Sequence, residues 1–293
     1  MARRFAPFAA LDGDSNFHGG NAVEFNRSAP DVLRFKMVKH GSPFCLWFYF
    51  RASVPVGRRV SFELVNTYDT LGRPESWSSV RVVCSYDRRH WFRLPRKDCV
   101  FDPEGKVFRF SGRFARPVVY FAQAYPYVTE ELNALRRDLK GSGLLHERFA
   151  GTSGAGRPLP LWLLQARGLK GRRPVGLFLC ARHHSGESHG SWALDGFLRE
   201  FAYGRSPETR WLRANGSVLV APFVDLDGAV EGMYGKDRVP VDFNRDWSAN
   251  PVRPEIRRLQ LEIGAWAKKV HYAAHLDFHC PCLPHVHHMH SSV

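Results

Sequence analysis

The segment ARHHSGESHG, residues 181–190, contains three histidines and one glutamate and directly follows the apolar run PVGLFLC. Within it, His184 and Glu187 have the spacing H-x-x-E, which can turn an imidazole nitrogen and a carboxylate toward one point beyond the end of a strand. Zn²⁺ accepts both kinds of ligand at about 2.0–2.2 Å. Short His/Glu spacings also arise by chance, so the pair alone favours a polar surface loop over a metal site.

A third candidate ligand lies in HLDFHCP, where His279 ends an apolar strand that we place in the same sheet. A catalytic zinc commonly has three protein ligands and one open position, and two histidines with one glutamate are an established set. A buried histidine without a metal explains His279 equally well on local grounds. We interpret His183 and His189 as solvated residues without a role and His275 as facing the other layer. The hypothesis is therefore one zinc ion with three protein ligands.

The segment VPVDFNRDW, residues 239–247, adds groups that suit a carboxylate ligand and a histidine. Asn244 and Arg245 are adjacent, and the guanidinium fork of arginine binds a carboxylate through two hydrogen bonds. Asp242 could accept the second ring N–H of a ligating histidine and so fix its tautomer. Taken alone, the segment favours a turn whose Asp and Asn cap the local backbone.

Length and composition limit the kinds of protein that can carry these groups. A chain of 293 residues suggests two domains, since a domain usually has about 100–200 residues. No apolar stretch approaches the roughly 20 residues that span a bilayer, and the N-terminus does not resemble an export signal. The six cysteines are scattered, so we expect free thiols, a cytoplasmic location and no membrane association.

The formal net charge of +14 is consistent with an anionic partner such as nucleic acid, an acidic peptide or a phosphate-rich surface, but a solvated basic surface without such a partner explains it at least as well. The arginines that carry this charge are dispersed, and no dense basic block with interleaved aromatic residues occurs, which argues against nucleic acid. An acidic peptide or protein substrate is favoured instead. Nothing in the sequence indicates an oligomeric state.

The chain divides into two patterns of predicted elements. Residues 1–127 contain short segments rich in Val, Phe, Tyr and Trp without helices between them, which predicts an antiparallel β-sandwich. From residue 128 to 293, strands alternate with helices, among them TEELNALRRDLKG and PEIRRLQLEIGAWAKKV. This alternation predicts an α/β layer with a mixed, largely parallel sheet, and reactive groups collect at the carboxyl ends of such strands. The polar clusters RHHSGE, DLDG and HCP follow three of the predicted strands.

Together these motifs resemble the zinc carboxypeptidases of the M14 family, most closely the cytosolic-carboxypeptidase-like branch. ARHHSGES is similar to the family's Arg-x-His-Pro-Gly-Glu loop, VDLDGAVEGMYGKDRVPVDFNRDW to its Asp-Gly and Asp-x-Asn-Arg segment, and LDFHCP to its third-ligand strand. FHGGNAVEF, CLWFYFRA, SYDRRHW, AQAYPYV and GTSGAGRPLPLWLL look like the β-sandwich that precedes the catalytic domain in that branch. The resemblance thus extends over nearly the whole chain.

The resemblance implies a zinc site at the first motif. His184, Glu187 and His279 would be the ligands of one Zn²⁺ ion, and Asp242 would accept a hydrogen bond from His184. The proline of the usual loop is Ser185 here, which should loosen the loop slightly without removing a ligand.

The resemblance also implies how a substrate is held. Asn244 and Arg245 would bind the free C-terminal carboxylate of a peptide or protein, which selects its last residue. Arg238, with Lys236 as the alternative, would polarise the scissile carbonyl and stabilise the oxyanion. Removal of C-terminal glutamates is the activity that the branch and the positive charge indicate.

One participant of the family mechanism is missing from the sequence. The family uses a glutamate well downstream of the third ligand as general base, but the sequence ends 14 residues after His279 and has no Glu or Asp after Asp277. We therefore expect an incomplete catalytic domain with no general base and little hydrolysis, because a general base typically contributes about 10²–10⁴-fold. The ending CLPHVHHMHSSV could belong to a truncated or frameshifted product, to a metal-sequestering tail, or to a natural non-catalytic protein that binds zinc and peptide C-termini.

Overall fold

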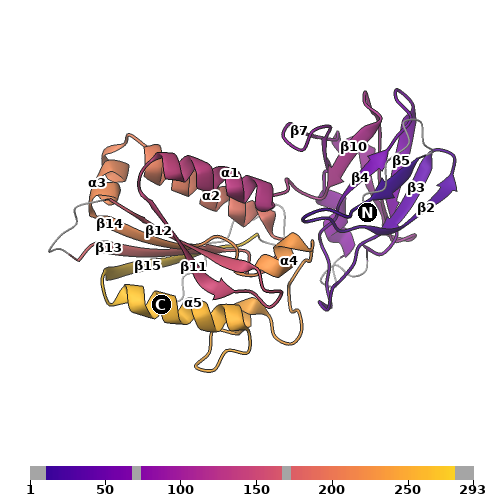
Figure 1. The fold of residues 1–293 in the computed structure, drawn as a ribbon. Coiled ribbons are helices and arrows are strands. Elements are labelled where there is room, and N and C mark those ends of the chain that lie inside the picture. Colours follow the sequence, from indigo (N-terminus) through magenta and orange to yellow (C-terminus); the bar gives the residue numbers. More distant parts are fainter. Residues whose placement is uncertain (1–10, 68–73, 167–172, 281–293) are drawn as a thin grey trace. The chain divides into compact units, whose positions relative to one another are not determined.

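The computed structural model describes residues 11–67, 74–166 and 173–280, and the histidine-rich ending CLPHVHHMHSSV lies outside them. The chain forms two compact units, with the division between Pro126 and Tyr127 (Figure 1). The short segment Glu231–Tyr234 belongs to the first unit, where the Asn21 side-chain amide donates to the Gly232 carbonyl at 2.8 Å. Each unit is described by itself below.

The described residues of the first unit form two five-stranded sheets and include the short 3-10 helices η2 and η3. The sheet orders are β1-β4-β10-β6-β7 and β2-β3-β5-β9-β8. The strands are β1 (Asp12–Asp14), β2 (Val23–Ala29), β3 (Val32–Lys36), β4 (Tyr49–Ser53), β5 (Arg59–Leu64), β6 (Val83–Ser85), β7 (Trp91–Arg93), β8 (Cys99–Asp102), β9 (Val107–Arg113) and β10 (Val118–Ala122), and the 3-10 helices are η2 (Pro74–Ser79) and η3 (Arg96–Asp98).

Aromatic side chains from the two sheets form the core of this unit. Alternate residues of a strand point to the same face, and Phe62 of β5 and Phe110 of β9 are fully buried in one sheet. Phe50 of β4 and Phe121 of β10 meet them from the other sheet, with ring centroids 4.5 Å apart for Phe62 and Phe121. Aromatic pairs at such distances stabilise beyond the area that they bury.

The prediction of a wholly antiparallel arrangement is wrong at one pair of strands. β3 and β5 pair in parallel, whereas β2–β3, β5–β9 and β8–β9 are antiparallel. The chain leaves β3, passes through β4 in the other sheet and returns to the first sheet in the same direction. A connection through a second sheet allows this parallel neighbour, which a two-residue hairpin does not.

A buried glutamate ties three strands of the first unit together. Glu63 on β5 is 5% exposed, and it accepts hydrogen bonds from Arg34 Nε at 2.8 Å and Arg109 Nη2 at 2.6 Å. Burial alone would raise the pKa of Glu63, but the two arginines hold this pKa below its usual value of 4.5. The charged carboxylate therefore stabilises the fold above this usual pKa, and the contribution is lost as pH falls through the lower folded pKa.

Glu63→Gln is expected to lower the free energy of unfolding by about 1 kcal/mol at neutral pH, because the arginines are half-exposed and the ion pairs are screened. Urea titrations at about pH 7 and pH 3 check this result, since the difference between variant and wild type should shrink at the lower pH. An equal difference at both pH values would contradict the role of the charge.

Outside residues 167–172, the second unit consists of a five-stranded sheet with helices packed against it. The sheet order is β11-β12-β14-β13-β15. The elements are α1 (Thr129–Gly141), β11 (Leu145–Thr152), β12 (Pro158–Gln165), β13 (Val175–Ala181), α2 (Ser188–Tyr203), α3 (Pro207–Asn215), β14 (Gly216–Ala221), α4 (Leu226–Val230), η4 (Phe243–Arg245), α5 (Pro254–Ala267) and β15 (His271–Phe278).

The sheet of the second unit is mixed, and its parallel part is confined to three strands. β13 pairs in parallel with both β14 and β15, whereas β12 pairs antiparallel with β11 and β14. Helices connect the parallel strands, while β11 and β12 form a hairpin. The prediction of a largely parallel sheet is thus confirmed for β13, β14 and β15, which the predicted polar clusters follow. It is wrong for β11 and β12.

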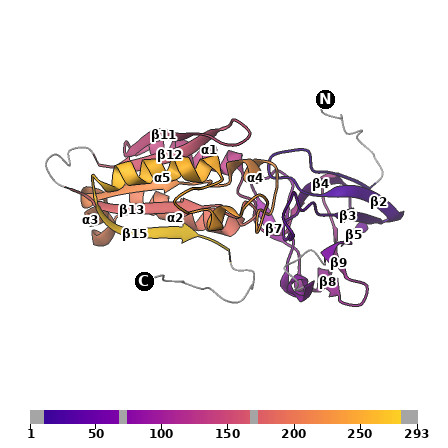
Figure 2. The ribbon, with the colours of Figure 1, turned by 90° about the horizontal axis from the view of Figure 1, so that it is seen from below.

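Helices cover both faces of this sheet, with α1 and α2 on one face and α5 on the other (Figure 1). β14 is buried along its whole length, whereas β15 lies beside β13 at the edge (Figure 2). In the described part of the chain, no helix has both the length and the apolar character required to cross a bilayer. The five described cysteines are free thiols.

Candidate metal centre

Two parallel strand ends position the candidate ligands. Ala181, the last residue of β13, pairs with Phe278, the last residue of β15. The loop that carries His184 and Glu187 follows β13 and leads into α2, while His279 comes directly after β15. The carboxyl ends of parallel strands lie at the same edge of a sheet, so residues almost a hundred positions apart meet there.

Gly190 in the first turn of α2 allows this helix to approach the end of β15. A Cβ atom at position 190 would overlap the carbonyl group of Phe278 and would crowd the backbone nitrogen of His279. Because the obstacle is backbone, it cannot turn aside as a flexible side chain could.

Gly190→Ala is expected to displace the end of β15, to destabilise the protein by about 1–3 kcal/mol and to weaken metal binding at His279. Thermal unfolding and zinc titration of the variant check both effects. Gly196→Ala on the same helix is the matched control, because nothing lies within 4 Å of an added Cβ there. Equal zinc affinity in the two variants would show that the close approach does not position His279.

Three donor groups converge at this edge. Glu187 Oε1 lies 2.9 Å from His184 Nδ1, and Glu187 Oε2 lies 2.9 Å from His279 Nδ1. The ligand atoms of these three residues all lie within 4.8 Å of one another. Ligand atoms that surround a zinc ion at about 2.0–2.2 Å have separations of this size, so the donor set fits the metal.

A carboxylate faces the far ring nitrogen of each candidate histidine. His184 Nε2 lies 3.2 Å from Asp242 Oδ2, and His279 Nε2 lies 2.6 Å from Asp277 Oδ2. Asp242 is itself held by the backbone N–H groups of Asp237 and Asn244, both at 2.7 Å. A metal-ligating histidine typically donates its second N–H to a carboxylate in this way.

The pKa values of the site show that it is built around negative charge. Burial would raise the pKa of Glu187, but hydrogen bonds from His184 and His279 lower this pKa to about 2. Burial would lower the pKa of His279, but Asp277 and Glu187 raise this pKa to about 10. Asp242 and Glu187 likewise raise the pKa of His184 against its burial. The carboxylates of Glu187, Asp242 and Asp277 contact these imidazoles, and protons or a divalent cation can balance their charge.

The candidate carboxylate-binding residues follow Asp242 in the 3-10 helix η4. Asn244 is half-buried, and its amide nitrogen lies 3.4 Å from His279 Nε2. Arg245 is exposed, with its guanidinium 3.3 Å from the Asn244 carbonyl. The structure therefore brings Asn244 next to a candidate metal ligand and leaves the Arg245 side chain accessible to a substrate.

The candidate oxyanion residue Arg238 lies in a buried ion pair. Its Nη2 donates to Asp225 Oδ1 at 2.9 Å, and its guanidinium packs over the Phe243 ring at 5.3 Å. The alternative, Lys236, is half-buried. The charge of Arg238 is thus shared with Asp225, and its role toward a substrate carbonyl stays a prediction.

The structure corrects the interpretation of two histidines. His183 is fully buried rather than solvated, and it bonds to Asp277 and Trp247. His275 does not face away from Asp277, because both residues contact Cys180 on the neighbouring strand. The period of two along a strand places residues 275, 277 and 279 on one side, and this signal in HLDFH indicates Asp277 as a further member of the site. His189 is exposed, as expected.

Known proteins are similar to this chain over most of its length. Residues 14–124 match the family model described as the cytosolic carboxypeptidase N-terminal domain. Cytosolic carboxypeptidase 1 of Danio rerio is 26% identical over 284 residues, which covers 83% of this chain and 24% of that protein. An uncharacterized protein of Zymomonas mobilis is 23% identical over 238 residues, covering 81% of this chain and 60% of that protein.

A solved structure shares the fold at higher coverage. The metallo-carboxypeptidase from Burkholderia cenocepacia superposes with a TM-score of 0.82 and 26% identity, over 94% of this chain and 71% of that chain. The fold of this chain is therefore similar to that of a metallo-carboxypeptidase. The chain is a homologue of the cytosolic carboxypeptidases, as its motifs indicate, and it spans 60% or less of the length of the two curated relatives named above.

Proposed function

We propose that this chain is a zinc-dependent metallocarboxypeptidase-type protein that acts on the C-terminal peptide bond of peptides or proteins. The observation that carries the proposal is the convergence of His184, Glu187 and His279, with a carboxylate behind each imidazole. This arrangement supports a site for one zinc ion that keeps an open position for substrate. The homology to cytosolic carboxypeptidases supports the same class of reaction.

The surrounding residues have separate tasks in this proposal. Zinc, when bound, supplies a Lewis acid for peptide-bond hydrolysis. Arg245 and Asn244 bind the terminal carboxylate of the peptide and so place the last peptide bond at the site. Arg238, or Lys236 in its place, donates hydrogen bonds to the scissile carbonyl oxygen as negative charge develops on it.

The proposal also covers the class of substrate and the rate of hydrolysis. The net charge of +14 supports an acidic peptide, such as one ending in glutamate. Among the described residues, the carboxylates that contact the site are each bonded to a histidine. A free general base is therefore not identified there, and this supports impaired hydrolysis. The alternative is a non-catalytic protein that binds zinc and peptide C-termini.

The proposal also includes the role of the first unit and the cellular location of the protein. We infer that the two aromatic-packed sheets of the first unit form the β-sandwich that accompanies the carboxypeptidase domain in this branch. A cytoplasmic location is supported by the cytosolic relatives and by the free thiols of the described cysteines.

Peptide binding and hydrolysis test the proposal together. The zinc-loaded protein is expected to bind a glutamate-terminated peptide with a free C-terminus and to bind the C-terminally amidated peptide at least about tenfold more weakly. Arg245→Ala should remove this preference, whereas Arg210→Ala, at another exposed arginine, should not. Release of the last amino acid would identify an enzyme, and binding without release would favour the non-catalytic alternative. Equal binding of the free and amidated peptides would contradict both.

A further inference from the structure

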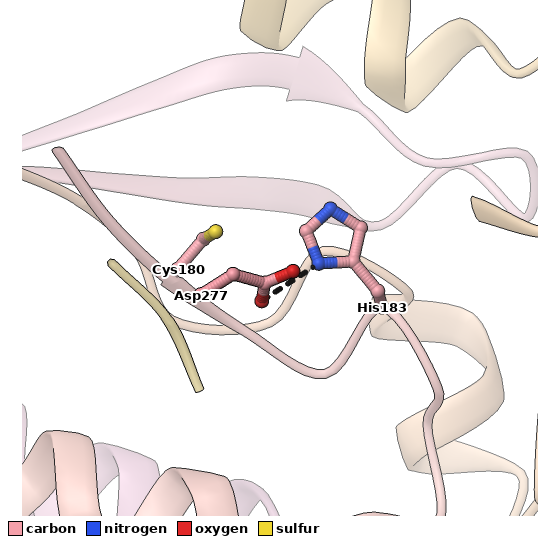
Figure 3. Close-up of side chains that lie close together, drawn as sticks. All are labelled: Cys180, His183 and Asp277. Atoms are coloured by element: carbon pink, nitrogen blue, oxygen red, sulfur yellow. Dashed lines mark hydrogen bonds and ion pairs between the residues drawn. The ribbon is translucent and has the colours of Figure 1, made fainter. Parts of the chain in front are cut away.

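A second group of residues lies beside the candidate metal centre and contains the buried Cys180 and His183 and the half-buried Asp277 (Figure 3). Their potential ligand atoms lie within 4.8 Å of one another, so the group could hold a metal of its own or could serve the neighbouring site. The hydrogen bonds of His183 decide between these possibilities.

Both ring nitrogens of His183 are engaged. The Trp247 indole N–H donates to His183 Nε2 at 2.9 Å, and an indole nitrogen can only donate. His183 Nε2 must therefore be the acceptor, which places the ring proton on Nδ1. His183 Nδ1 lies 3.0 Å from Asp277 Oδ1 and donates to it (Figure 3). A nitrogen that carries a proton cannot bind a metal, so this group is a poor metal site.

Asp277 connects His183 to the third candidate ligand. One carboxylate oxygen accepts from His183, and the other lies 2.6 Å from His279 Nε2. The opposite nitrogen of His279, Nδ1, faces Glu187 in the metal centre. With Asp277 as acceptor, the proton of His279 stays on Nε2, and the lone pair of Nδ1 points toward the metal position.

The two candidate histidine ligands are thus supported in different ways. The carboxylate behind His184 is fixed by two backbone N–H groups. The carboxylate behind His279 is fixed by a side chain, His183, whose own tautomer is set by Trp247. The His183 ring is fully buried and packs at 5.6 Å from the Trp247 ring, so it has little freedom to turn.

We propose that Trp247, His183 and Asp277 form a positioning chain that fixes the tautomer and orientation of His279 for metal binding. The proposal rests on the zinc site proposed above. His183, which is not itself a ligand, then determines how tightly zinc is held, because groups that support a ligating histidine typically contribute about 10–100-fold to metal affinity.

Zinc competition with a chromophoric chelator tests the chain. The full-length protein is used with His285, His287, His288 and His290 replaced by alanine, so that these residues do not bind metal. His183→Leu and Asp277→Asn are each expected to lower zinc affinity about 10–100-fold while one zinc per chain still binds at saturation. Trp247→Phe keeps the aromatic packing but removes the N–H, so it should give a smaller loss.

His183→Gln is the matched rescue variant, because glutamine keeps one acceptor and one donor. It should hold zinc within about threefold of the wild type, and the visible absorption of its Co²⁺ form should resemble that of the wild type, whereas the His183→Leu spectrum should differ. Thermal unfolding of the metal-free proteins shows whether each variant folds. If His183→Leu does not fold, Trp247→Phe and Asp277→Asn still test the positioning chain.

The outcomes separate this inference from the proposed function. Wild-type affinity in all the chain variants, together with loss of zinc in His184→Ala, would overturn the positioning chain and leave the zinc site intact. Two zinc ions per chain, one of them lost in Cys180→Ser, would show that the group of Cys180, His183 and Asp277 is a second metal site instead. Absence of zinc from the wild-type protein would overturn the proposed function itself, and the positioning chain with it.

Discussion

Simultaneous replacement of His184 and Glu187 by alanine is expected to abolish stoichiometric zinc binding. Both side chains are almost fully buried and face each other at 2.9 Å, and together they supply two of the three candidate ligands. Apparent zinc binding free energies of about 10–16 kcal/mol are shared among about four ligands, so loss of two ligands should lower zinc affinity by about 10³-fold or more. Metal content after dialysis should fall from one zinc per chain to none.

Two controls make this measurement specific. The four histidines between positions 285 and 290 should first be replaced by alanine, since a histidine-rich segment can bind metal by itself. His189→Ala then serves as the matched variant, because this exposed histidine lies only two residues after Glu187. An unchanged metal content in the double variant, or an equal loss in His189→Ala, would refute the assignment of the ligands.

The sequence predicted the candidate ligands more readily than the side chains that contact them. The H-x-x-E spacing and the histidine at the end of a strand are local features, and each requires only one predicted element. The contacts of Asp277 and His183 were missed because they join distant segments: His183, in the loop after β13, bonds both to Asp277 on β15 and to Trp247. A loop histidine among glycines and serines is expected to be solvated, but His183 is fully buried and contacts Asp277, Trp247 and His279.

Local sequence likewise determines where helices and strands form, whereas contacts between distant segments determine how the strands pair. Helices α1 and α5 begin at the first residues of the predicted segments TEELNALRRDLKG and PEIRRLQLEIGAWAKKV, and strands such as β5 and β13 follow from their apolar residues. The parallel pairing of β3 with β5 depends on β4 joining the other sheet, and no short segment encodes that choice. The hairpin β11–β12 and the strands β14, β13 and β15 likewise differ in direction because of their connections, not because of their composition.

Removal of the buried carboxylate of Asp225 is expected to have the largest effect on stability. Asp225, just beyond β14, is fully buried, and its Oδ1 accepts hydrogen bonds from Arg238 Nη2 and the Gly228 backbone N–H, both at 2.9 Å. The buried guanidinium of Arg182 lies near enough to interact electrostatically with this carboxylate. Burial raises the pKa of Asp225, although Arg238 and Gly228 oppose the shift. The carboxylate therefore connects the loop after β13 with the loop before Asp242.

Asp225→Ala is expected to destabilise the second unit by about 3–5 kcal/mol, because removal of one partner leaves a buried charge without compensation. Urea unfolding followed by circular dichroism should show a lower midpoint. Glu63→Gln is the control here, since it changes a carboxylate of the first unit only.

The double variant Asp225→Ala with Arg238→Met separates the effect of losing the ion pair on stability from the effect of losing side-chain volume. Replacement of both members of a buried ion pair is commonly less costly than removal of one, so the double variant should be more stable than the sum of the single effects by about 1–3 kcal/mol. Arg213→Met is a suitable reference for the arginine change. The Arg213 guanidinium donates to the carbonyls of Phe201, Ala202 and Gly204, and among its hydrogen bonds in the described residues none has an acidic partner. Strict additivity of Asp225→Ala and Arg238→Met would mean that the two buried charges do not depend on each other, and the loop after β14 would then owe its position to backbone hydrogen bonds such as that of Gly228.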